Sequence, residues 1–310
     1  MHPEIKWPGQ AAFAFTVFDD TDLSVLPDIK YLYDFLKDLG FRTTKSVWPL
    51  KGRETPHIGG TTCEDPDYLA WARQLEADGF ELGFHCATYA TSSRERTLQG
   101  LDRFRILFGH DPLTYANHAD CEEGLYWGSA RVSGWRAAFY NLLTRYRNAG
   151  RYQGHVETSP LFWGDACRER IRYMRNFVLG DINTLKACPC MPYHDPERPY
   201  VNGWFASSEG PDVNAFSAMI SEPAQDRLEA EGGACIMYTH FACGFVENGV
   251  INPRWKSLME RLSRKRGHFV PVTPLLDFLG RGQNHTLTGR ERVRLERQWL
   301  LHKIRCRGSS

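Results

Sequence analysis

Short apolar runs alternate with helical stretches over most of the chain. Residues 11–18 (AAFAFTVF) form a continuous apolar run, which is typical of a strand covered on both faces. A helix is predicted over 24–39, because Ser24 and Pro27 suit its first turn and Gly40 suits its end. The same reasoning predicts further strands at 41–47, 80–84, 112–116, 182–187, 200–206, 234–238 and 269–272, and further helices at 65–78, 92–108, 221–231, 253–265 and 274–279.

This alternation predicts an α/β fold made of repeated strand–helix units. The pattern is interrupted only at 121–175, which is rich in aromatic residues and arginine and is expected to form long loops and short helices. Since no linker divides the units, a single TIM-like barrel over residues 1–280 is the simplest arrangement. A doubly wound open sheet is the alternative, although no glycine-rich phosphate loop follows any of the predicted strands.

The last thirty residues differ from the barrel region in composition. Residues 281–310 carry eight Lys or Arg against two Glu, and Leu295, Trp299, Leu300 and Ile304 recur near helical spacing. We therefore expect a basic C-terminal helix or tail that packs one apolar stripe on the barrel. Contact with an anionic partner, or with a second copy in a homo-oligomer, stays open.

Overall charge and hydropathy exclude two classes of protein. Lys and Arg total 38 against 37 Asp and Glu, so the basic excess typical of a nucleic-acid-binding domain is missing. No apolar run reaches the roughly 18 residues that a membrane span needs. The first ten residues lack the features of a secretory signal, which predicts a cytoplasmic protein whose nine cysteines are reduced.

Chemically reactive residues recur just after the predicted strands, where the active face of a barrel lies. Asp19 and Asp20 end the first strand, and the histidines follow three later ones: His85, His118 and His240. One carboxylate with two imidazoles is the ligand set of a catalytic divalent metal, most often Zn²⁺, although iron, cobalt, nickel and manganese accept similar sets. A second carboxylate and a further histidine would supply the base and the acid of a hydrolase.

Three of these strand ends carry a family resemblance over residues 11–275. Phe18-Asp19-Asp20-Thr21 resembles the Phe-Asp-Asp-Gly motif of the polysaccharide deacetylases, which include the chitin and peptidoglycan deacetylases. Residues 80–85 (FELGFH) resemble the second motif, and Tyr238-Thr239-His240 resembles the last one. The resemblance implies a distorted (β/α)7 barrel in which a metal ion activates water to remove acetyl groups from sugars. It also implies that Asp19 is the general base, Asp20 and His85 are metal ligands, and His240 is the general acid.

The chain departs from the family pattern at several positions. The second motif normally has another metal-binding histidine four residues after the first, where this chain has Tyr89. We expect His118, at the next strand end, to complete the metal set. The Gly after the Asp pair is Thr21, and the Arg-x-Pro-Tyr motif is replaced by the segment around Asn117.

Aromatic and polar residues near these strand ends are candidates for binding a sugar, because sugar sites combine stacking surfaces with hydrogen-bonding groups. The candidate substrate-binding residues are Trp48, Tyr89, Asn117, His155, Trp163, Asp165, His194 and Asp195. The leading hypothesis is a metal-dependent hydrolase that removes an acetyl or other acyl group from an N-acetylated sugar or glycan precursor. The alternatives are hydrolysis of another C–N amide bond on the same barrel, and a carbohydrate-binding protein whose metal site has decayed.

Overall fold

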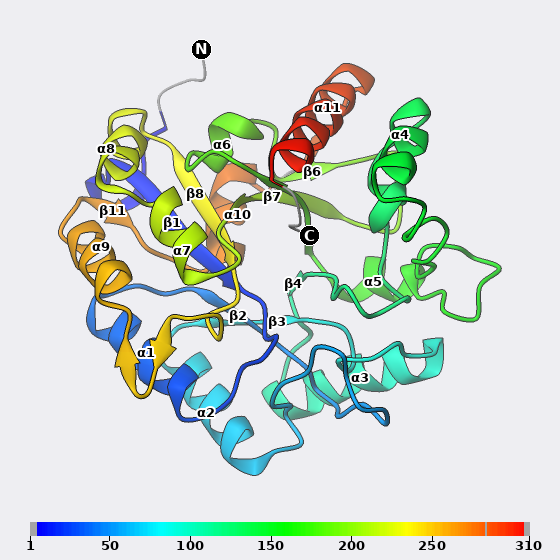
Figure 1. The fold of residues 1–310 in the computed structure, drawn as a ribbon, viewed down its shortest axis with the longest axis horizontal. Coiled ribbons are helices and arrows are strands. Elements are labelled where there is room, and N and C mark those ends of the chain that lie inside the picture. Colours follow the sequence, from blue (N-terminus) through cyan, green and yellow to red (C-terminus); the bar gives the residue numbers. More distant parts are fainter. Residues whose placement is uncertain (1–4, 283, 307–310) are drawn as a thin grey trace.

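The computed structural model describes residues 5–282 and 284–306, so positions 283 and 307–310 of the predicted tail lie outside the described residues. Its centre is a closed ring of parallel strands surrounded by helices, as Figure 1 shows. The ring follows the order β1 (Phe13–Asp19), β2 (Thr44–Val47), β3 (Glu81–Phe84), β4 (Thr114–Tyr115), β5 (Tyr173–Leu179), β7 (Gly203–Glu209) and β8 (Ala234–Thr239).

Pairing of the first and last ring strands closes the barrel. β1 pairs with β8 from Ala14–Ala234 to Asp19–Thr239, and on its other side it pairs with β2 at Phe18 and Asp19. The predicted (β/α)7 barrel is therefore confirmed. Because the ring strands are parallel, their carboxyl ends meet at one face of the barrel.

Shorter strands extend the main sheet or form a separate hairpin. β11 (Gly267–His268) pairs with the start of β1, and β6 (Tyr193–His194) joins β7 to β12 (His285–Thr286). The hairpin consists of β9 (Val246–Glu247) and β10 (Val250–Ile251).

The helices lie outside the ring, and local sequence signals define several of their ends. The Ser93 hydroxyl caps α3 by accepting a hydrogen bond from the Arg96 N–H, and Gly109 ends that helix with a left-handed φ of 84°. The helices are α1 (Asp28–Asp38), α2 (Pro66–Ala77), α3 (Arg94–Phe108), α4 (Trp135–Leu143), α5 (Gly164–Arg170), α6 (Thr184–Ala187), α7 (Val213–Met219), α8 (Glu222–Ala230), α9 (Pro253–Ser263), α10 (Val272–Gly280) and α11 (Gly289–Arg305), with 3-10 turns η1 (Pro8–Gln10) and η2 (Gly128–Arg131).

Three sequence predictions in the second half of the chain were wrong. The strand expected at 269–272 does not form, since the short strand β11 ends at His268 and helix α10 begins at Val272. The strand expected at 182–187 is instead the short helix α6, because the Asn183 side chain accepts a hydrogen bond from the Lys186 N–H and caps a helical turn. Strand β5 lies at the end of the region expected to be irregular. Arg175 and Asn176 interrupt its apolar pattern, yet all seven of its residues are buried.

Helix α11 packs on the barrel beside β5 and α4 (Figure 1). The Trp299 ring is fully buried, with its centroid 5.7 Å from that of Phe177 and 5.3 Å from that of Tyr140. Glu296 is also fully buried, where it pairs with Arg136 and lies 3.5 Å from Arg198. The expected C-terminal helix is confirmed for 289–305, whereas a domain division at residue 280 stays a prediction.

Two further sequence expectations concern the membrane and the cysteines. Within the part of the chain that the structure describes, no helix has the length and apolar character needed to cross a bilayer. All nine cysteines are free thiols, and six of them are buried.

Candidate functional site

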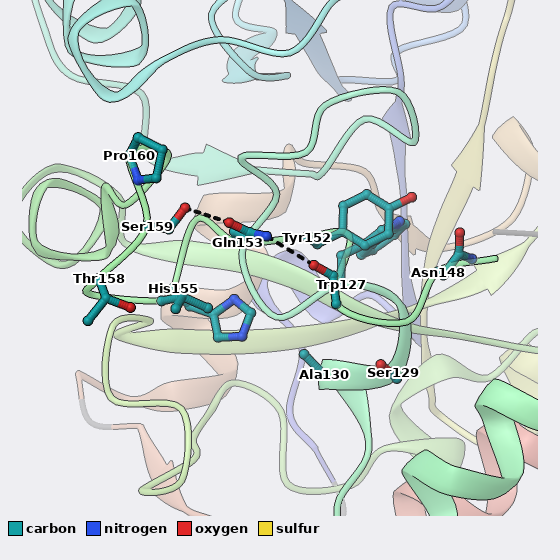
Figure 2. Close-up of a pocket in the computed structure, with 12 residues that line it drawn as sticks. Trp127, Ser129, Ala130, Asn148, Tyr152, Gln153, His155, Thr158, Ser159 and Pro160 are labelled. Atoms are coloured by element: carbon teal, nitrogen blue, oxygen red, sulfur yellow. Dashed lines mark hydrogen bonds between the residues drawn. The ribbon is translucent and has the colours of Figure 1, made fainter. Parts of the chain in front are cut away.

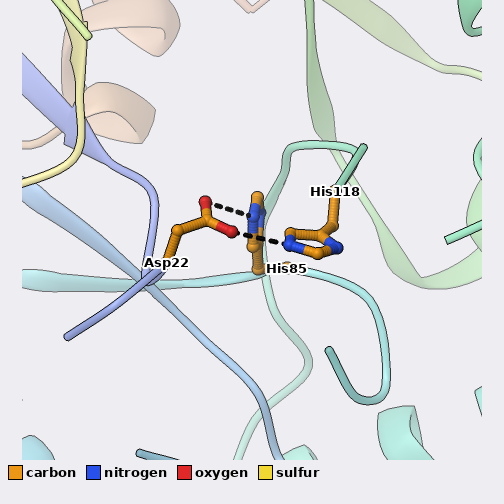
Figure 3. Close-up of side chains that lie close together, drawn as sticks. All are labelled: Asp22, His85 and His118. Atoms are coloured by element: carbon orange, nitrogen blue, oxygen red, sulfur yellow. Dashed lines mark hydrogen bonds and ion pairs between the residues drawn. The ribbon is translucent and has the colours of Figure 1, made fainter. Parts of the chain in front are cut away.

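Four barrel strands bring acidic and imidazole side chains together just beyond their carboxyl ends. Asp22 follows β1, and its Oδ1 lies 2.6 Å from His118 Nε2 after β4. Its Oδ2 lies 3.3 Å from His85 Nε2 after β3 and 3.1 Å from His240 Nε2 after β8. Figure 3 shows the two imidazole rings of His85 and His118 approaching the Asp22 carboxylate. We name Asp20, Asp22, His85, His118 and His240 the strand-end cluster.

The histidines determine the ionisation of the central carboxylate. Burial alone would raise the pKa of Asp22, but the charge of His85 and the close approach of His118 and His240 outweigh it and hold that pKa well below its usual value. Burial likewise opposes a charged His240, yet Asp22 and Asp20 raise the pKa of His240 to about 9. Without a metal ion, Asp22 is therefore anionic and His240 cationic at neutral pH.

Asp20 lies beside this centre and is held from the opposite side of the barrel. Arg175 on β5 crosses the barrel mouth and donates two hydrogen bonds to the Asp20 carboxylate, one of them 2.8 Å long. Both side chains are almost completely buried, so this is a bidentate ion pair in a site that largely excludes water. One Asp20 oxygen still lies within 4.8 Å of ligand atoms of Asp22 and His240.

Asp19 has a different environment from its two acidic neighbours. Lys45 Nζ lies 2.9 Å from its Oδ2, the Tyr33 hydroxyl donates to the same oxygen, and the Phe241 N–H donates to Oδ1. Burial raises the pKa of Asp19, although Lys45 and these hydrogen bonds partly offset it. Both oxygens of Asp19 are thus engaged in holding β1, β2 and the start of the loop after β8.

Trp48 and Tyr89 pack behind the histidines. The Trp48 ring centroid lies 5.8 Å from that of His85 and 5.4 Å from that of His118, and the indole is fully buried. Tyr89 packs edge-on against Trp48, and its hydroxyl donates to the Gly52 carbonyl at 3.1 Å. In this arrangement Trp48 packs against both imidazoles, and Tyr89 supports Trp48 by packing against its ring.

Most of the remaining predicted substrate-binding residues make contacts within the protein. The Asn117 amide binds the backbone of Leu125 on both sides, and the buried Trp163 donates from Nε1 to the Glu123 carbonyl. Asp165 and Asp195 form ion pairs with Arg94 and Arg198. His194 lies 3.3 Å from the Val201 carbonyl. A role of these residues in substrate binding stays a prediction.

His155 differs because it lines a cavity. The segment between β4 and β5 folds around a hollow of about 430 Å³, and His155 lies on its wall together with Trp127 and Tyr152 (Figure 2). We name this hollow the insertion cavity, defined by its lining residues Trp127, Ser129, Ala130, Asn148, Gly150, Tyr152, Gln153, His155, Val156, Thr158, Ser159 and Pro160.

Two residues of the site did not emerge as functional from the sequence. Asp22 stands two positions after Asp20, but the family motif includes only the adjacent pair Asp19-Asp20. Arg175 is a single charged residue in an otherwise apolar run, and no motif marks it as functional. Asp22, His85 and His118 have ligand atoms close enough together to hold one metal ion, and Asp20, Asp22 and His240 form an overlapping group of the same kind. Such an arrangement can bind a cation and move protons beside it.

No protein-family model matches the sequence, and no curated protein matches it either.

Solved structures nevertheless resemble the chain over most of its length. Puue allantoinase aligns with a TM-score of 0.51 and 13% identity, covering 89% of this chain and 93% of that one. A structure from Mycobacterium smegmatis assigned to the polysaccharide deacetylases gives 0.51 and 11%, covering 92% and 96% of the two chains. Another, from Pseudomonas aeruginosa PAO1, gives 0.50 and 12%, covering 90% and 94%. The chain therefore has the fold shared by polysaccharide deacetylases and allantoinase, which confirms at the level of the fold the resemblance seen in its strand-end motifs.

Proposed function

We propose that this protein is a metal-dependent hydrolase that removes an acyl group from an N-acylated sugar. The observation that carries the proposal is the convergence of Asp22, His85 and His118, from three different strand ends, on one buried point. The fold supports a hydrolase of this class, and the resemblance of the motifs favours an acetyl group and a carbohydrate substrate.

The donor atoms present fit a divalent metal ion. His118 Nε2 and Asp22 Oδ1 approach to 2.6 Å, yet among the described residues neither atom has an aligned hydrogen bond. Both atoms therefore keep a lone pair that a cation could accept, and a bound ion would draw them apart. Two imidazoles and one carboxylate leave positions for substrate and favour zinc. A bound ion would polarise the acyl carbonyl and make a water molecule more acidic.

Asp20 is the better candidate for the general base. One of its oxygens lies within 4.8 Å of ligand atoms of Asp22 and His240, whereas Asp19 is directed toward Lys45, Tyr33 and the Phe241 N–H. The Arg175 pair orients the Asp20 carboxylate, and each of its oxygens keeps a further lone pair that can accept a proton from the attacking water. Asp19 then acts as a positioning residue for the loop that carries Asp20 and Asp22.

His240 is suited to protonate the departing amine. Its Nδ1 lies 3.1 Å from the Pro211 carbonyl, to which an Nδ1–H donates, and this contact directs Nε2 toward Asp22. A proton held at Nε2 is therefore presented to the centre of the cluster. Tyr238 Oη, 3.4 Å from the same nitrogen, limits rotation of the ring.

Metal analysis combined with a substrate screen tests this proposal. The purified chain should hold about one zinc or similar ion, and it should release acetate from at least one compound in a panel of N-acetylated sugars. His85→Ala should lower the metal content and abolish the release, because it removes one of three ligands. His110→Ala is the matched control, since His110 lies on the surface and pairs with Glu76.

The outcomes separate the alternatives. Full metal content in His85→Ala would contradict the proposed ligand set. Metal-dependent turnover of cyclic amides, but not of acetylated sugars, would favour hydrolysis of another C–N bond on the same barrel. Sugar binding without metal or turnover would indicate a binding protein with a decayed site.

A further inference from the structure

Large apolar side chains gather on the outer sides of α4 and α11. Thirteen such side chains are exposed in residues 5–282 and 284–306, and six of them lie on these two helices and the turn after α4: Trp135, Leu142, Leu143, Tyr146, Leu301 and Ile304. Trp135, Leu142 and Tyr146 are 67%, 64% and 62% exposed. Single exposed apolar residues are ordinary, whereas a concentration of them marks a surface that contacts a protein or a membrane.

The two helices pack on each other, so their outer sides are neighbouring parts of the surface (Figure 1). Tyr140 of α4 stacks on the buried Trp299 of α11, with ring centroids 5.3 Å apart. On the exposed side of α11, Arg297, Leu301 and Ile304 recur at helical spacing. The helix is therefore amphipathic in an unusual way, because apolar residues occur on its outer side as well as on its buried side.

Exposed arginines accompany these apolar residues. Within the same ranges none of the following six forms an ion pair: Arg145, Arg147, Arg290, Arg294, Arg297 and Arg305. Residues 124–156 contain five Arg and no Asp or Glu, although the formal net charge of the whole chain is only +1. We name the six apolar residues and the six arginines together the α4–α11 surface.

The turn after α4 presents both kinds of side chain together. Arg145 and Tyr146 have left-handed backbone conformations, with φ of 51° and 60°, which residues other than glycine rarely adopt. Tyr146 is exposed between Arg145 and Arg147, and both arginines are exposed too. Bulky residues at backbone positions that suit glycine are a sign that the side chains themselves are needed.

An anionic lipid surface fits this combination better than other partners do. At a bilayer interface, Trp and Tyr rings lie at the level of the headgroups, Leu and Ile enter the acyl boundary, and Arg side chains extend to the phosphates. A nucleic acid would contact the arginines but would leave the aliphatic residues without a role. A second copy of the chain would bring like charges together.

The C-terminal end of this surface lies close to the barrel mouth. His302 of α11 pairs with Glu209, the last residue of β7. Since the carboxyl ends of the ring strands form the face that carries the strand-end cluster, Ile304 and Arg305 lie within one helical turn of a residue at the edge of that face.

We propose that the α4–α11 surface binds the face of an anionic bilayer and so holds the edge of the barrel mouth near the lipid. The arginines would pair with lipid phosphates, and the apolar side chains would enter the interface between headgroups and acyl chains. This inference goes beyond the proposed function and does not depend on it.

Vesicle sedimentation with the full chain tests the proposal. The vesicles consist of phosphatidylcholine alone or of phosphatidylcholine mixed with phosphatidylglycerol, at about 0.1 M and about 1 M salt, because the higher concentration screens surface charges beyond roughly 3 Å. Arg145→Gln/Arg147→Gln removes two charges from the surface. Its matched control is Arg264→Gln/Arg266→Gln, at exposed positions after α9 with the same spacing and the same change in net charge.

A second pair of variants tests the apolar part of the surface. Leu301→Gln removes one apolar side chain, and Ile106→Gln is its matched control, since Ile106 is 71% exposed on α3. The wild type and both controls should bind the mixed vesicles at the lower salt concentration and should not bind phosphatidylcholine alone. Arg145→Gln/Arg147→Gln should bind roughly thirtyfold more weakly, and Leu301→Gln about tenfold more weakly.

The other outcomes count against the proposal. It is overturned if the wild type does not bind the mixed vesicles, or if Arg145→Gln/Arg147→Gln binds as well as its control. Binding to polyglutamate as tight as to the vesicles, with no effect of Leu301→Gln, would assign the surface to an acidic protein instead. Dimers that Leu301→Gln dissociates, in a chain that ignores vesicles, would assign it to a second copy. Acetate release measured without vesicles reports on the proposed function separately, so either hypothesis can fail alone.

Discussion

The strand-end cluster and the insertion cavity lie next to each other but differ in nearly every physical property. The cluster is charged and closed: Asp22, His85 and His118 are 6%, 1% and 2% exposed, and opposite charges compensate one another within it. The cavity is open and lined by uncharged residues of a long connection between two strands. Strands and buried ion pairs can hold reacting groups rigidly, whereas a loop can vary in shape without disturbing them. The buried charged groups therefore lie on the rigid strand ends, and the uncharged cavity lies on the more variable connection between β4 and β5.

We expect the largest effect on activity from a substitution of an acidic residue in the strand-end cluster. Asp20→Asn should lower kcat by about 10² to 10⁴, the usual contribution of one proton-transferring group, while metal content is retained. Asp19→Asn should reduce kcat less, since Asp19 acts through the position of the loop. Steady-state kinetics and metal analysis of both variants check this. A greater loss in Asp19→Asn would instead support the roles that the family resemblance implies.

His155, which lines the insertion cavity, should make the stability of the protein depend on pH. The pKa of folded His155 is about 4, below its usual 6.5, so between these values the unfolded chain binds a proton that the folded chain does not. Stability should therefore be complete above about pH 6.5 and fall as the pH decreases toward 4. His155 is partly exposed, so we expect a loss on the order of 2 kcal/mol.

Denaturant unfolding between pH 7 and pH 4 measures this loss. His155→Asn keeps an acceptor for the Tyr126 N–H but cannot titrate, so its stability should depend less on pH. His57→Asn, at an exposed position, should behave like the wild type. Equal pH dependence in the wild type and His155→Asn would show that His155 is not the source.

We expect the smallest effect from Tyr89, which packs beside the cluster without belonging to it. Tyr89→Phe removes the hydrogen bond to the Gly52 carbonyl and should cost about 1 kcal/mol of unfolding free energy without changing the metal content. His118→Ala should lower the metal content instead. Thermal unfolding and metal analysis of the two variants distinguish a packing residue from a ligand. Loss of metal in Tyr89→Phe alone would reverse the assignment.

The regular part of the fold could be predicted from the sequence because its signals are local. An apolar run marks β1, and Ser93 and Gly109 mark the two ends of α3. Strand β5 could not be recognised, because Arg175 fits in a buried strand only when Asp20 faces it from the other side of the ring. That partner is 155 residues away in the sequence.

The candidate site was predictable in its location but not in its details. Because β3, β4 and β8 are parallel, the residues that follow them, His85, His118 and His240, lie at the same face of the barrel regardless of loop conformation. The backbone turn after β1 decides which of Asp19, Asp20 and Asp22 meets these histidines, and a motif of adjacent acids cannot encode that choice. The insertion cavity depends on long-range contacts such as Tyr152 with Ala119, which sequence periodicity does not report.

The buried carboxylate of Glu296 has a consequence for how the chain matures during synthesis. Its partners, Arg136 and Arg198, leave the ribosome well before it does. Until α11 emerges, Arg136 lacks the buried anion with which it pairs, and Arg198 has Asp195 but not Glu296. We therefore expect the segments beside them to reach their final structure only after residue 296 has been made, so that a nascent chain forms its barrel before the wall of the insertion cavity.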